Sequence, residues 1–329
     1  MPLIRADANP NTVGITLILI GIVAISVNDL LIKFLSGGYP LHQMIFFRSA
    51  IGIAFSLILV QWEGGWSILK TRRPGLHILR GVLVVISNIL FFAALAVLPL
   101  ADATALFFVA PLMITLLSIP LLKEPVGPWR LGAVFVGLLG VVIMMKPWAG
   151  AGALEVPRYV LLLPVASALF YALNQIMTRK LGLTTQASAM AVYIQGMFII
   201  VSLVFWAVAG DGRYAADATN PSVVFLLRAW IWPQGMDIWL FLGLGLNSAI
   251  VGYCLAQAYR LANAATIAPF EYVGLPLAVF WGWLIFADLP DLAVTTGIVL
   301  ILGAGLFVFL RERILGRRLA SAARLQKRN

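Results

Sequence analysis

Long apolar runs follow one another along almost the whole chain, and short polar stretches separate them. A run of about 18 residues or more lets a helix cross a hydrocarbon core about 30 Å thick. The runs lack the alternation of membrane strands, and a bilayer otherwise accepts only helices, whose backbone groups pair internally. We therefore predict an all-α polytopic membrane protein with ten transmembrane helices, at residues 13–35, 42–61, 76–97, 101–122, 128–146, 159–179, 186–208, 236–259, 264–286 and 292–310.

The boundary between the third and fourth runs is the least marked, because only Leu98 to Asp102 interrupts a long apolar stretch. Pro99 in this segment favours a tight turn. The first run is longer than the apolar part of a signal peptide and has no clear small-residue cleavage site, so we interpret it as a helix of the mature chain.

The composition agrees with a membrane protein, since 62% of the residues are hydrophobic and 11% charged, against about 25% charged in soluble domains. Basic residues then orient the helices, because short cytoplasmic loops carry an excess of Lys and Arg. With the N-terminus inside, the 23 basic residues divide into ten in inner segments, Arg80 among them, seven in the tail after residue 310 and six near the outer side. We therefore expect both termini in the cytoplasm.

The net charge of +10 is concentrated in a basic cytoplasmic tail, residues 311–329. Anionic lipid of the inner leaflet attracts such a tail, so we expect membrane lipid and no nucleic acid as its partner. The one long connection is an extracytoplasmic loop at 209–235, which contains Trp230 and Trp232. Because tryptophan favours the headgroup region, this loop is either an interfacial helix lying flat on the membrane or a lid over a binding site.

The two halves of the chain share a faint internal repeat. Pro111, Pro125, Gly132 and Gly140 recur at an offset of 165 residues as Pro276, Pro290, Gly297 and Gly305; Ala96, Ala103, Thr104 and Phe108 recur at 162 as Ala258, Ala265, Thr266 and Phe270; and Asn28 and Lys33 match Asn174 and Arg179 at 146. With five helices per half the second copy is inverted, which suits alternating access. Duplication without transport is the competing interpretation. The predicted parts are an N-terminal cytoplasmic tail at 1–12, repeats at 13–146 and 159–310, and an extracytoplasmic linker at 147–158.

Ionisable residues inside spans are few, and each costs roughly 2.5–3.5 kcal/mol on insertion scales unless it is paired or faces water. Asp29 and Arg48 lie at similar depths below the outer ends of the first two spans and are placed to form an ion pair. This pair is either a fixed brace or part of an outer gate and substrate contact. Glu271 has no basic residue at its depth, so it is a candidate proton- or cation-binding group, unless Asn174 or Gln175 holds it neutral.

Uncharged polar and aromatic side chains in the spans would furnish a cavity that stacks against and hydrogen-bonds a flat polar solute. Taken singly, each is equally explained by a hydrogen bond between neighbouring helices. The substrate or coupling candidates are Asn28, Asp29, Arg48, Asn88, Tyr171, Asn174, Gln195, Tyr253, Glu271, Tyr272 and Trp281, and the candidate hinges are Pro111, Pro269 and Pro276. His42 and His77 fall at span ends, where we expect them in the headgroup zone.

Catalytic and metal-binding motifs are absent from the sequence, which has no H-E-x-x-H, no G-x-S-x-G and no acidic metal cluster. The lone cysteine, Cys254, lies in an apolar run and is interpreted as a small buried hydrophobe. We therefore expect no enzyme activity, no metal site and no cofactor.

An ordered set of segments carries a resemblance to a known family. These are Ala101-Asp102-Ala103-Thr104-Ala105, Ala110-Pro111-Leu112, Leu122-Lys123-Glu124-Pro125, Arg130-Leu131-Gly132 and Gly137-Leu138-Leu139-Gly140-Val141, then Ala264-Ala265-Thr266, Pro269-Phe270-Glu271-Tyr272, Phe286-Ala287-Asp288-Leu289-Pro290 and Gly297. Over residues 13–310 the chain resembles the ten-helix EamA-type permeases of the drug/metabolite transporter superfamily. Asp288 departs from the usual glutamate before this proline. Three features look most like the branch of S-adenosylmethionine and riboflavin uptake carriers: Asn28-Asp29 with Lys33, Phe46-Phe47-Arg48, and Pro269-Phe270-Glu271-Tyr272.

The resemblance implies a bacterial inner-membrane protein that carries a small polar or aromatic metabolite through a central cavity by secondary transport. A coupling proton and a homodimer are compatible with it. Two alternatives stay open: a flippase for a lipid-linked sugar and, less favoured, a membrane-embedded enzyme with a constellation near Asp29, Arg48 or Glu271.

Overall fold

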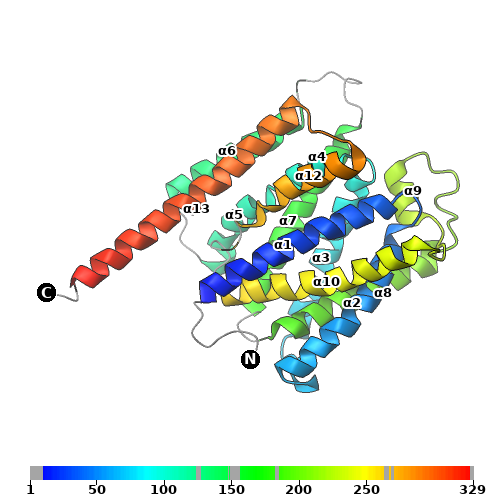
Figure 1. The fold of residues 1–329 in the computed structure, drawn as a ribbon, viewed down its shortest axis with the longest axis horizontal. Helices are drawn as coiled ribbons and strands as arrows, with labels where there is room; N and C mark the ends of the chain where they lie inside the picture. Colours follow the sequence, from blue (N-terminus) through cyan, green and yellow to red (C-terminus); the bar gives the residue numbers. More distant parts are fainter. Residues whose placement is uncertain are drawn as a thin grey trace.

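The computed structural model describes residues 10–123, 127–146, 148, 156–181, 185–262, 267 and 270–326, and within these ranges the regular elements are all helical (Figure 1). In chain order they are α1 (Pro10–Leu35), α2 (Leu41–Glu63), the short 3-10 helix η1 (Trp66–Leu69), α3 (Pro74–Leu95), α4 (Leu100–Phe107), α5 (Ala110–Leu122), α6 (Pro128–Met144), α7 (Arg158–Leu181), α8 (Ala187–Ala209), α9 (Pro221–Leu227), α10 (Met236–Leu261), α12 (Gly274–Phe286) and α13 (Leu292–Gln326).

Seven helical segments of the described chain are long and apolar enough to cross a membrane: Thr12–Leu35, Leu41–Glu63, Pro74–Leu95, Leu100–Leu122, Arg158–Leu181, Ala187–Ala209 and Met236–Leu261. Three shorter apolar helices, Leu131–Met144, Gly274–Phe286 and Leu292–Phe307, coincide with the other predicted spans. The prediction of a polytopic helical membrane protein is confirmed. The turn predicted around Pro99 is also present, since α3 ends at Leu95 and α4 begins at Leu100.

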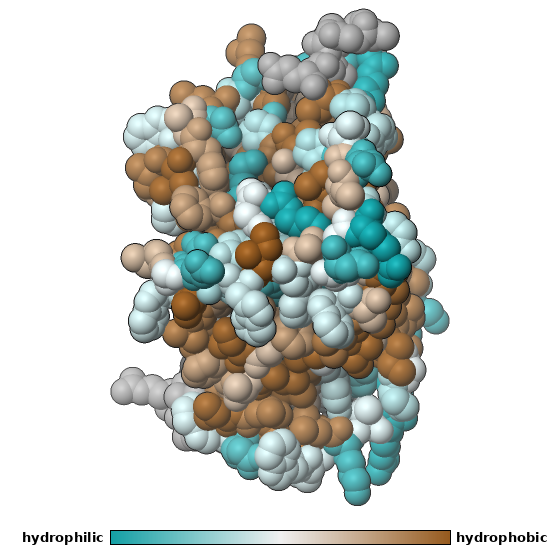
Figure 2. Space-filling view, turned by 90° about the vertical axis from the view of Figure 1, so that its right-hand side faces the viewer, coloured by the Kyte–Doolittle hydropathy of each residue, from teal (hydrophilic) through white to brown (hydrophobic). Residues whose placement is uncertain are grey.

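The outer surface of the bundle is apolar, as a lipid-facing surface must be. Phe135 of α6, Leu284 of α12 and Ile200 of α8 are each more than half exposed. On the face that lies to the right in Figure 1, hydrophilic side chains gather near the middle of the view, and hydrophobic ones cover the area just below them and part of the upper left (Figure 2). The long helices therefore present their apolar sides outward.

Two helix breaks precede prolines that the sequence marked as hinges. α4 ends at Phe107 and α5 begins at Ala110, just before Pro111. A turn at residues 272–273 likewise precedes α12, which contains Pro276 in its first turn. Proline has no N–H to donate to the preceding turn, so the helix ladder is interrupted there. Pro269, the third hinge candidate, lies outside the described residues, as do Pro125, Ala265 and Thr266 of the internal repeat and Glu124 of the family segment.

The helices associate in long pairs. α1 packs along α10, α3 along α7, and α2 along α8, while α6 and α13 form a pair at one edge of the molecule (Figure 1). Gly140 and Gly297 let α6 and α13 approach closely, because a Cβ built on either glycine lies within 3.0 Å of the other's carbonyl oxygen. Small residues commonly allow such contacts between membrane helices.

Three segments show local structure that the sequence did not specify. The segment after residue 310 continues α13 as a helix to Gln326. The long connection forms a helix only over α9, and Trp230 packs against Phe46, Phe47 and Trp206 while Trp232 is 76% exposed. The side chains of His42 and His77 are buried, because neighbouring segments cover the helix ends: His42 Nδ1 lies 2.9 Å from the carbonyl oxygen of Leu226, and the His77 ring lies 4.5 Å from that of Tyr193.

Candidate functional site

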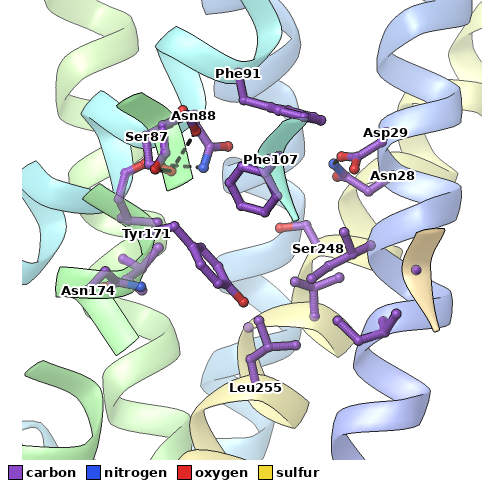
Figure 3. A pocket seen from close by; sticks show the side chains of 18 of the residues that line it. Asn28, Asp29, Ser87, Asn88, Phe91, Phe107, Tyr171, Asn174, Ser248 and Leu255 are labelled. Atoms are coloured by element: carbon purple, nitrogen blue, oxygen red, sulfur yellow. Dashed lines mark hydrogen bonds between the residues drawn. The ribbon is translucent and has the colours of Figure 1, made fainter. Parts of the chain in front are cut away.

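A cavity of about 180 Å³ lies in the middle of the helix bundle (Figure 3). Its walls come from α1, α2, α3, α4, α7, α8, α10 and α12 together with Glu271. In Figure 3, Asn28 and Asp29 of α1 lie on one side of the cavity and Tyr171 and Asn174 of α7 on the other. The predicted site residues that line it are Asn28, Asp29, Arg48, Asn88, Tyr171, Asn174, Gln195 and Glu271.

Arg48 is held in the cavity wall by two amide side chains. Its Nη1 donates to Asn28 Oδ1 at 3.3 Å and its Nη2 to Asn88 Oδ1 at 3.4 Å, and the guanidinium carbon lies 4.9 Å from the centre of the Phe198 ring. Asn28 Nδ2 in turn donates to Asp29 Oδ1 at 3.2 Å. The predicted direct ion pair is therefore replaced by a relay, in which Asn28 stands between the carboxylate and the guanidinium.

Glu271 is 3% exposed and lies just before α12. Tyr171 Oη donates to its Oε1 at 3.2 Å, and Tyr259 Oη donates to the same oxygen. Among the described residues, these two hydroxyls are the side-chain groups that hydrogen-bond the Glu271 carboxyl. The groups that hold the carboxyl are two tyrosine hydroxyls from α7 and α10, rather than Asn174 or Gln175.

Arg80 lines the same cavity, although the sequence placed it among the inner loop residues. It is 3% exposed, its Nε donates to Thr178 Oγ1 at 2.7 Å, and its Nη1 donates to the carbonyl oxygen of Met190 at 3.2 Å. The signal that would have found it is Pro74. Proline favours the first helical position, so a helix that starts there carries Arg80 almost two turns inward.

An aromatic wall bounds part of the cavity. The ring centres of Phe91 and Phe107 lie 5.2 Å apart, and those of Phe107 and Tyr171 also lie 5.2 Å apart. Figure 3 shows Phe107 between Tyr171 and the α1 residues Asn28 and Asp29. Such a wall offers ring faces and edges to a flat solute. Phe91 and Phe107 were not among the sequence candidates.

Small hydroxyl groups complete the polar lining and were also missed. Ser87 and Ser167 donate to each other's carbonyl oxygens at 3.0 and 2.7 Å, which joins α3 to α7. Gln195 Nε2 donates to Ser248 Oγ at 2.7 Å, which joins α8 to α10. Serines are too frequent in membrane helices for the sequence alone to single these out.

Three candidates lie away from the cavity. Tyr253 Oη donates to Glu63 Oε1 at 3.1 Å, Tyr272 packs on the Phe108 ring, and Trp281 Nε1 donates to Ser26 Oγ at 3.3 Å. Tyr272 and Trp281 reach the lining indirectly, because Phe108 and Ser26 are both part of it. The structure therefore brings together eight of the eleven candidates in one cavity.

Glu63 is the last residue of α2 and links three helices at this end of the bundle. We call this end of the bundle the Glu63 end. Its Oε2 accepts hydrogen bonds from the backbone N–H of Ser188 at 3.1 Å and from Ser188 Oγ at 2.7 Å, while Tyr253 Oη donates to its Oε1. Ser188 lies in the first turn of α8, where unpaired N–H groups favour an acceptor of negative charge. One carboxylate thus ties α2, α8 and α10 together.

The opposite end, which we call the α9 end, is covered by the segment 210–235. Gln43 Nε2 donates to the carbonyl oxygen of Ile231 at 2.5 Å, and the N–H of Ile231 donates to Gln43 Oε1 at 3.1 Å. Arg228 Nη1 donates to the carbonyl oxygen of Gly37 at 2.6 Å. A small cavity lined by His42, Phe198 and Leu226 lies beneath α9. This segment therefore covers the start of α2 like a lid.

Comparisons with known proteins agree on one family. Residues 12–146 match the EamA-like transporter family. A riboflavin transporter of Vibrio cholerae is 31% identical over 283 residues, which are 85% of this chain and 87% of the relative. An S-adenosylmethionine uptake transporter of Rickettsia felis is 27% identical over 91% of this chain and 93% of its own length.

The resemblance extends to an exporter and to a solved structure. A pseudopaline exporter of Pseudomonas aeruginosa is 27% identical over 88% of this chain and 94% of its own length. A crystal structure that is 20% identical superimposes with a TM-score of 0.65 over 93% of this chain and 98% of that chain, which shows a shared fold. The chain belongs to the EamA-like transporter family of the drug/metabolite transporter superfamily.

Proposed function

We propose that this chain is a secondary transporter that moves a small polar or aromatic metabolite across the bacterial inner membrane by alternating access. The observation that carries the proposal is the central cavity, which is lined by charged side chains, amides and an aromatic wall. Polar groups are costly inside a membrane, and their convergence on one cavity is typical of a solute pathway. The named function of the relatives, transport of small molecules, supports the same interpretation.

The packing of the helices supports two inverted halves of five spans each. If α1, α2 and α3 correspond to α7, α8 and α10, the pairing of α1 with α10 is matched by the pairing of α7 with α3. The pairs α2 with α8 and α6 with α13 each join a helix to its counterpart. A two-fold axis in the membrane plane produces this pattern, and it lets the halves exchange conformations.

Two helix-end contacts support the same relationship. Lys33 of α1 donates through Nζ to the carbonyl oxygens of Leu95 and Leu98, at the end of α3. Arg179 of α7 donates through Nη1 to the carbonyl oxygen of Arg260, near the end of α10. Cations favour the carbonyl-rich C-terminus of a helix. The two residues that matched faintly in the sequence thus act alike at opposite ends of the bundle.

The basic-residue pattern favours the α9 end as the extracytoplasmic one, with both termini inside. Transport by this scheme would alternately release the contacts of Gln43 at the α9 end and those of Glu63 at the other. Glu271 is our candidate for the coupling proton, since the hydroxyls of Tyr171 and Tyr259 bind its carboxyl and its side chain lines the cavity.

The experiment is uptake into proteoliposomes containing the purified full chain, with labelled riboflavin, S-adenosylmethionine and other small aromatic metabolites, with and without a pH gradient. We expect saturable uptake of at least one of these solutes, and a stronger gradient response in the wild type than in Glu271→Gln. Asp211→Asn is the matched control, because Asp211 pairs with Arg213 in an exposed segment away from the cavity.

The proposal is overturned if no water-soluble solute enters the vesicles while a labelled lipid-linked sugar is flipped. The coupling assignment alone is overturned if Glu271→Gln responds to the pH gradient as the wild type does.

A further inference from the structure

Four charged side chains line the central cavity: Asp29, Arg48, Arg80 and Glu271. Among the described residues, the ion pairs join Lys146 with Asp291 and Arg213 with Asp211, so none of the four pairs with another. A buried charge normally has a partner of opposite sign, because its desolvation is costly. The positive and negative groups of the cavity therefore do not contact each other. Their hydrogen-bond partners are uncharged amide, hydroxyl and carbonyl groups.

The two arginines differ in how well they are held. Arg80 makes a 2.7 Å hydrogen bond to Thr178 Oγ1 and a 3.2 Å bond to a backbone carbonyl, which fix α3 to α7 and α8. The bonds of Arg48 are longer, at 3.3 and 3.4 Å, and its buried Nε has no hydrogen-bond partner among the described residues. Arg80 thus links three helices through its hydrogen bonds, whereas Arg48 has N–H groups that are weakly bonded or unpaired among the described residues.

The amides beside Arg48 are oriented toward it by bonds of their own. The Nδ2 of Asn28 donates to Asp29 Oδ1, and the Nδ2 of Asn88 donates to the carbonyl oxygen of Val84 at 3.1 Å, so both amide oxygens face the guanidinium. The Phe198 ring covers part of it. These neighbours orient the guanidinium without neutralising its charge. The Asp29 carboxylate contacts Asn28 and not Arg48.

We propose that Arg48 is the anion-binding residue of the cavity, and that the solute carries a carboxylate that binds its guanidinium. The proposal rests on the proposed transport function, since it names the class of solute taken by the same cavity. A carboxylate matches the planar fork of a guanidinium, and a charge-assisted hydrogen bond is about twice as strong as one to a neutral amide. Because Arg80 is engaged by Thr178 and Met190, Arg48 alone faces the solute, and with Asp29 nearby this disfavours dianions such as phosphate monoesters. The aromatic wall of Phe91, Phe107 and Tyr171 lies in the same cavity and suits a ring attached to the carboxylate.

The test is binding of matched acid and amide probes to the purified full chain, followed by the rise in Tm during titration. The probes are nicotinate against nicotinamide, and indole-3-acetate against indole-3-acetamide. We expect the wild type to bind at least one acid more tightly than its amide. In Arg48→Gln the acid should bind about 10- to 100-fold more weakly, because a charged hydrogen-bond partner is lost, whereas the amide should be unaffected.

Two further variants keep the test decisive. Arg48→Lys keeps the charge but loses the fork, so it should retain part of the preference even if Arg48→Gln fails to fold. Arg73→Gln removes an exposed positive charge at the start of α3 and should leave the preference unchanged. Equal binding of acid and amide to the wild type, or a preference that survives both Arg48 substitutions, overturns the inference.

This measurement does not require transport, so the two proposals fail separately. An acid preference that depends on Arg48 in a chain that moves no solute would overturn the transport proposal and leave the anion site. Uptake of a solute without any acid preference would support the transport proposal and overturn the anion site.

Discussion

The amide oxygen of Asn28 lies 3.3 Å from Arg48 Nη1, and this contact separates the guanidinium from the neighbouring carboxylate of Asp29. A direct ion pair would satisfy both charges and consume the binding capacity of each. With an amide between them, both groups stay in the cavity wall and available to a solute. The relay is therefore consistent with a binding role for Arg48 rather than a fixed brace between α1 and α2.

Asn28→Asp tests this interpretation. The new carboxylate would sit against Arg48 and pair with it, so the substrate carboxylate would have to compete with an internal anion. We expect the chain to fold and the KM of its transported solute to rise about tenfold, corresponding to about 1.4 kcal/mol. The measurement is concentration-dependent uptake into proteoliposomes.

The control for Asn28→Asp is Asn220→Asp. Asn220 Oδ1 accepts from the N–H of Ser222 at the start of α9, where aspartate serves equally well as a cap. This variant should keep the KM of the wild type. If Asn28→Asp also keeps it, Arg48 does not bind the solute through the edge that Asn28 contacts.

The sequence predicted the seven long spans well because the signal for them is long and depends only on composition. It also predicted the break before Pro111, since a missing N–H is a local property of one residue. The sequence does not predict which side chains at one depth of the membrane contact each other. Asp29 and Arg48 share a depth, but nothing in the spacing of one helix tells that Asn28, and not Asp29, contacts the neighbouring helix.

Arg80 illustrates a second limit. Counting basic residues near span ends treats each of them as a loop residue, and this is correct on average. Arg80 departs from the average because Thr178 and the Met190 carbonyl, roughly 100 residues further along the chain, supply acceptors inside the bundle. Such partners depend on the tertiary arrangement.

The contact between α6 and α13 gives a prediction about stability. A Cβ on Gly140 would lie 2.9 Å from the carbonyl oxygen of Gly297 and 3.2 Å from Ile301 Cγ1, so the helices would have to separate. We expect Gly140→Ala to destabilise the chain by about 1–3 kcal/mol, as overpacking usually does. The measurement is the Tm of the purified protein in detergent.

Gly132→Ala is the matched control, because Gly132 lies on the same helix and a Cβ there meets nothing within 4 Å. Its Tm should stay the same or rise slightly, since alanine favours a helix more than glycine does. A similar loss of Tm in both variants would mean that helix contact is not what Gly140 provides.

A pH-dependent contribution to stability is expected from Asp291, which lies just before α13. Burial alone would raise its pKa, but the ammonium of Lys146 and the backbone N–H groups of Val294 and Ala293 outweigh this and hold the pKa below 3.8. A carboxyl whose pKa is depressed by folding stabilises the protein above its unfolded pKa, and this contribution is lost as the pH falls through the folded pKa.

The wild type should therefore have a higher Tm than Asp291→Asn at neutral pH, and the difference should shrink below a pH of about 4. Asp217→Asn, at an exposed position in the loop 209–235, should show no such pH-dependent difference. A difference between wild type and Asp291→Asn that stays constant down to the lowest pH at which the chain is folded would contradict the assignment.

The lid at the α9 end depends on Gln43, whose amide both donates to and accepts from the backbone of Ile231. Gln43→Ala removes both hydrogen bonds, each worth about 0.5–1.5 kcal/mol, so opening at this end should become roughly 5- to 150-fold more favourable.

The measurement is labelling of Ser202→Cys by a membrane-impermeant maleimide in a Cys254→Ala background. Ser202 lines the small cavity beneath α9. Labelling of intact cells should be faster with Gln43→Ala than without it. Gln186→Ala, before α8 at the Glu63 end, should leave the rate unchanged. Equal rates with and without Gln43→Ala would mean that the two hydrogen bonds do not hold the lid closed.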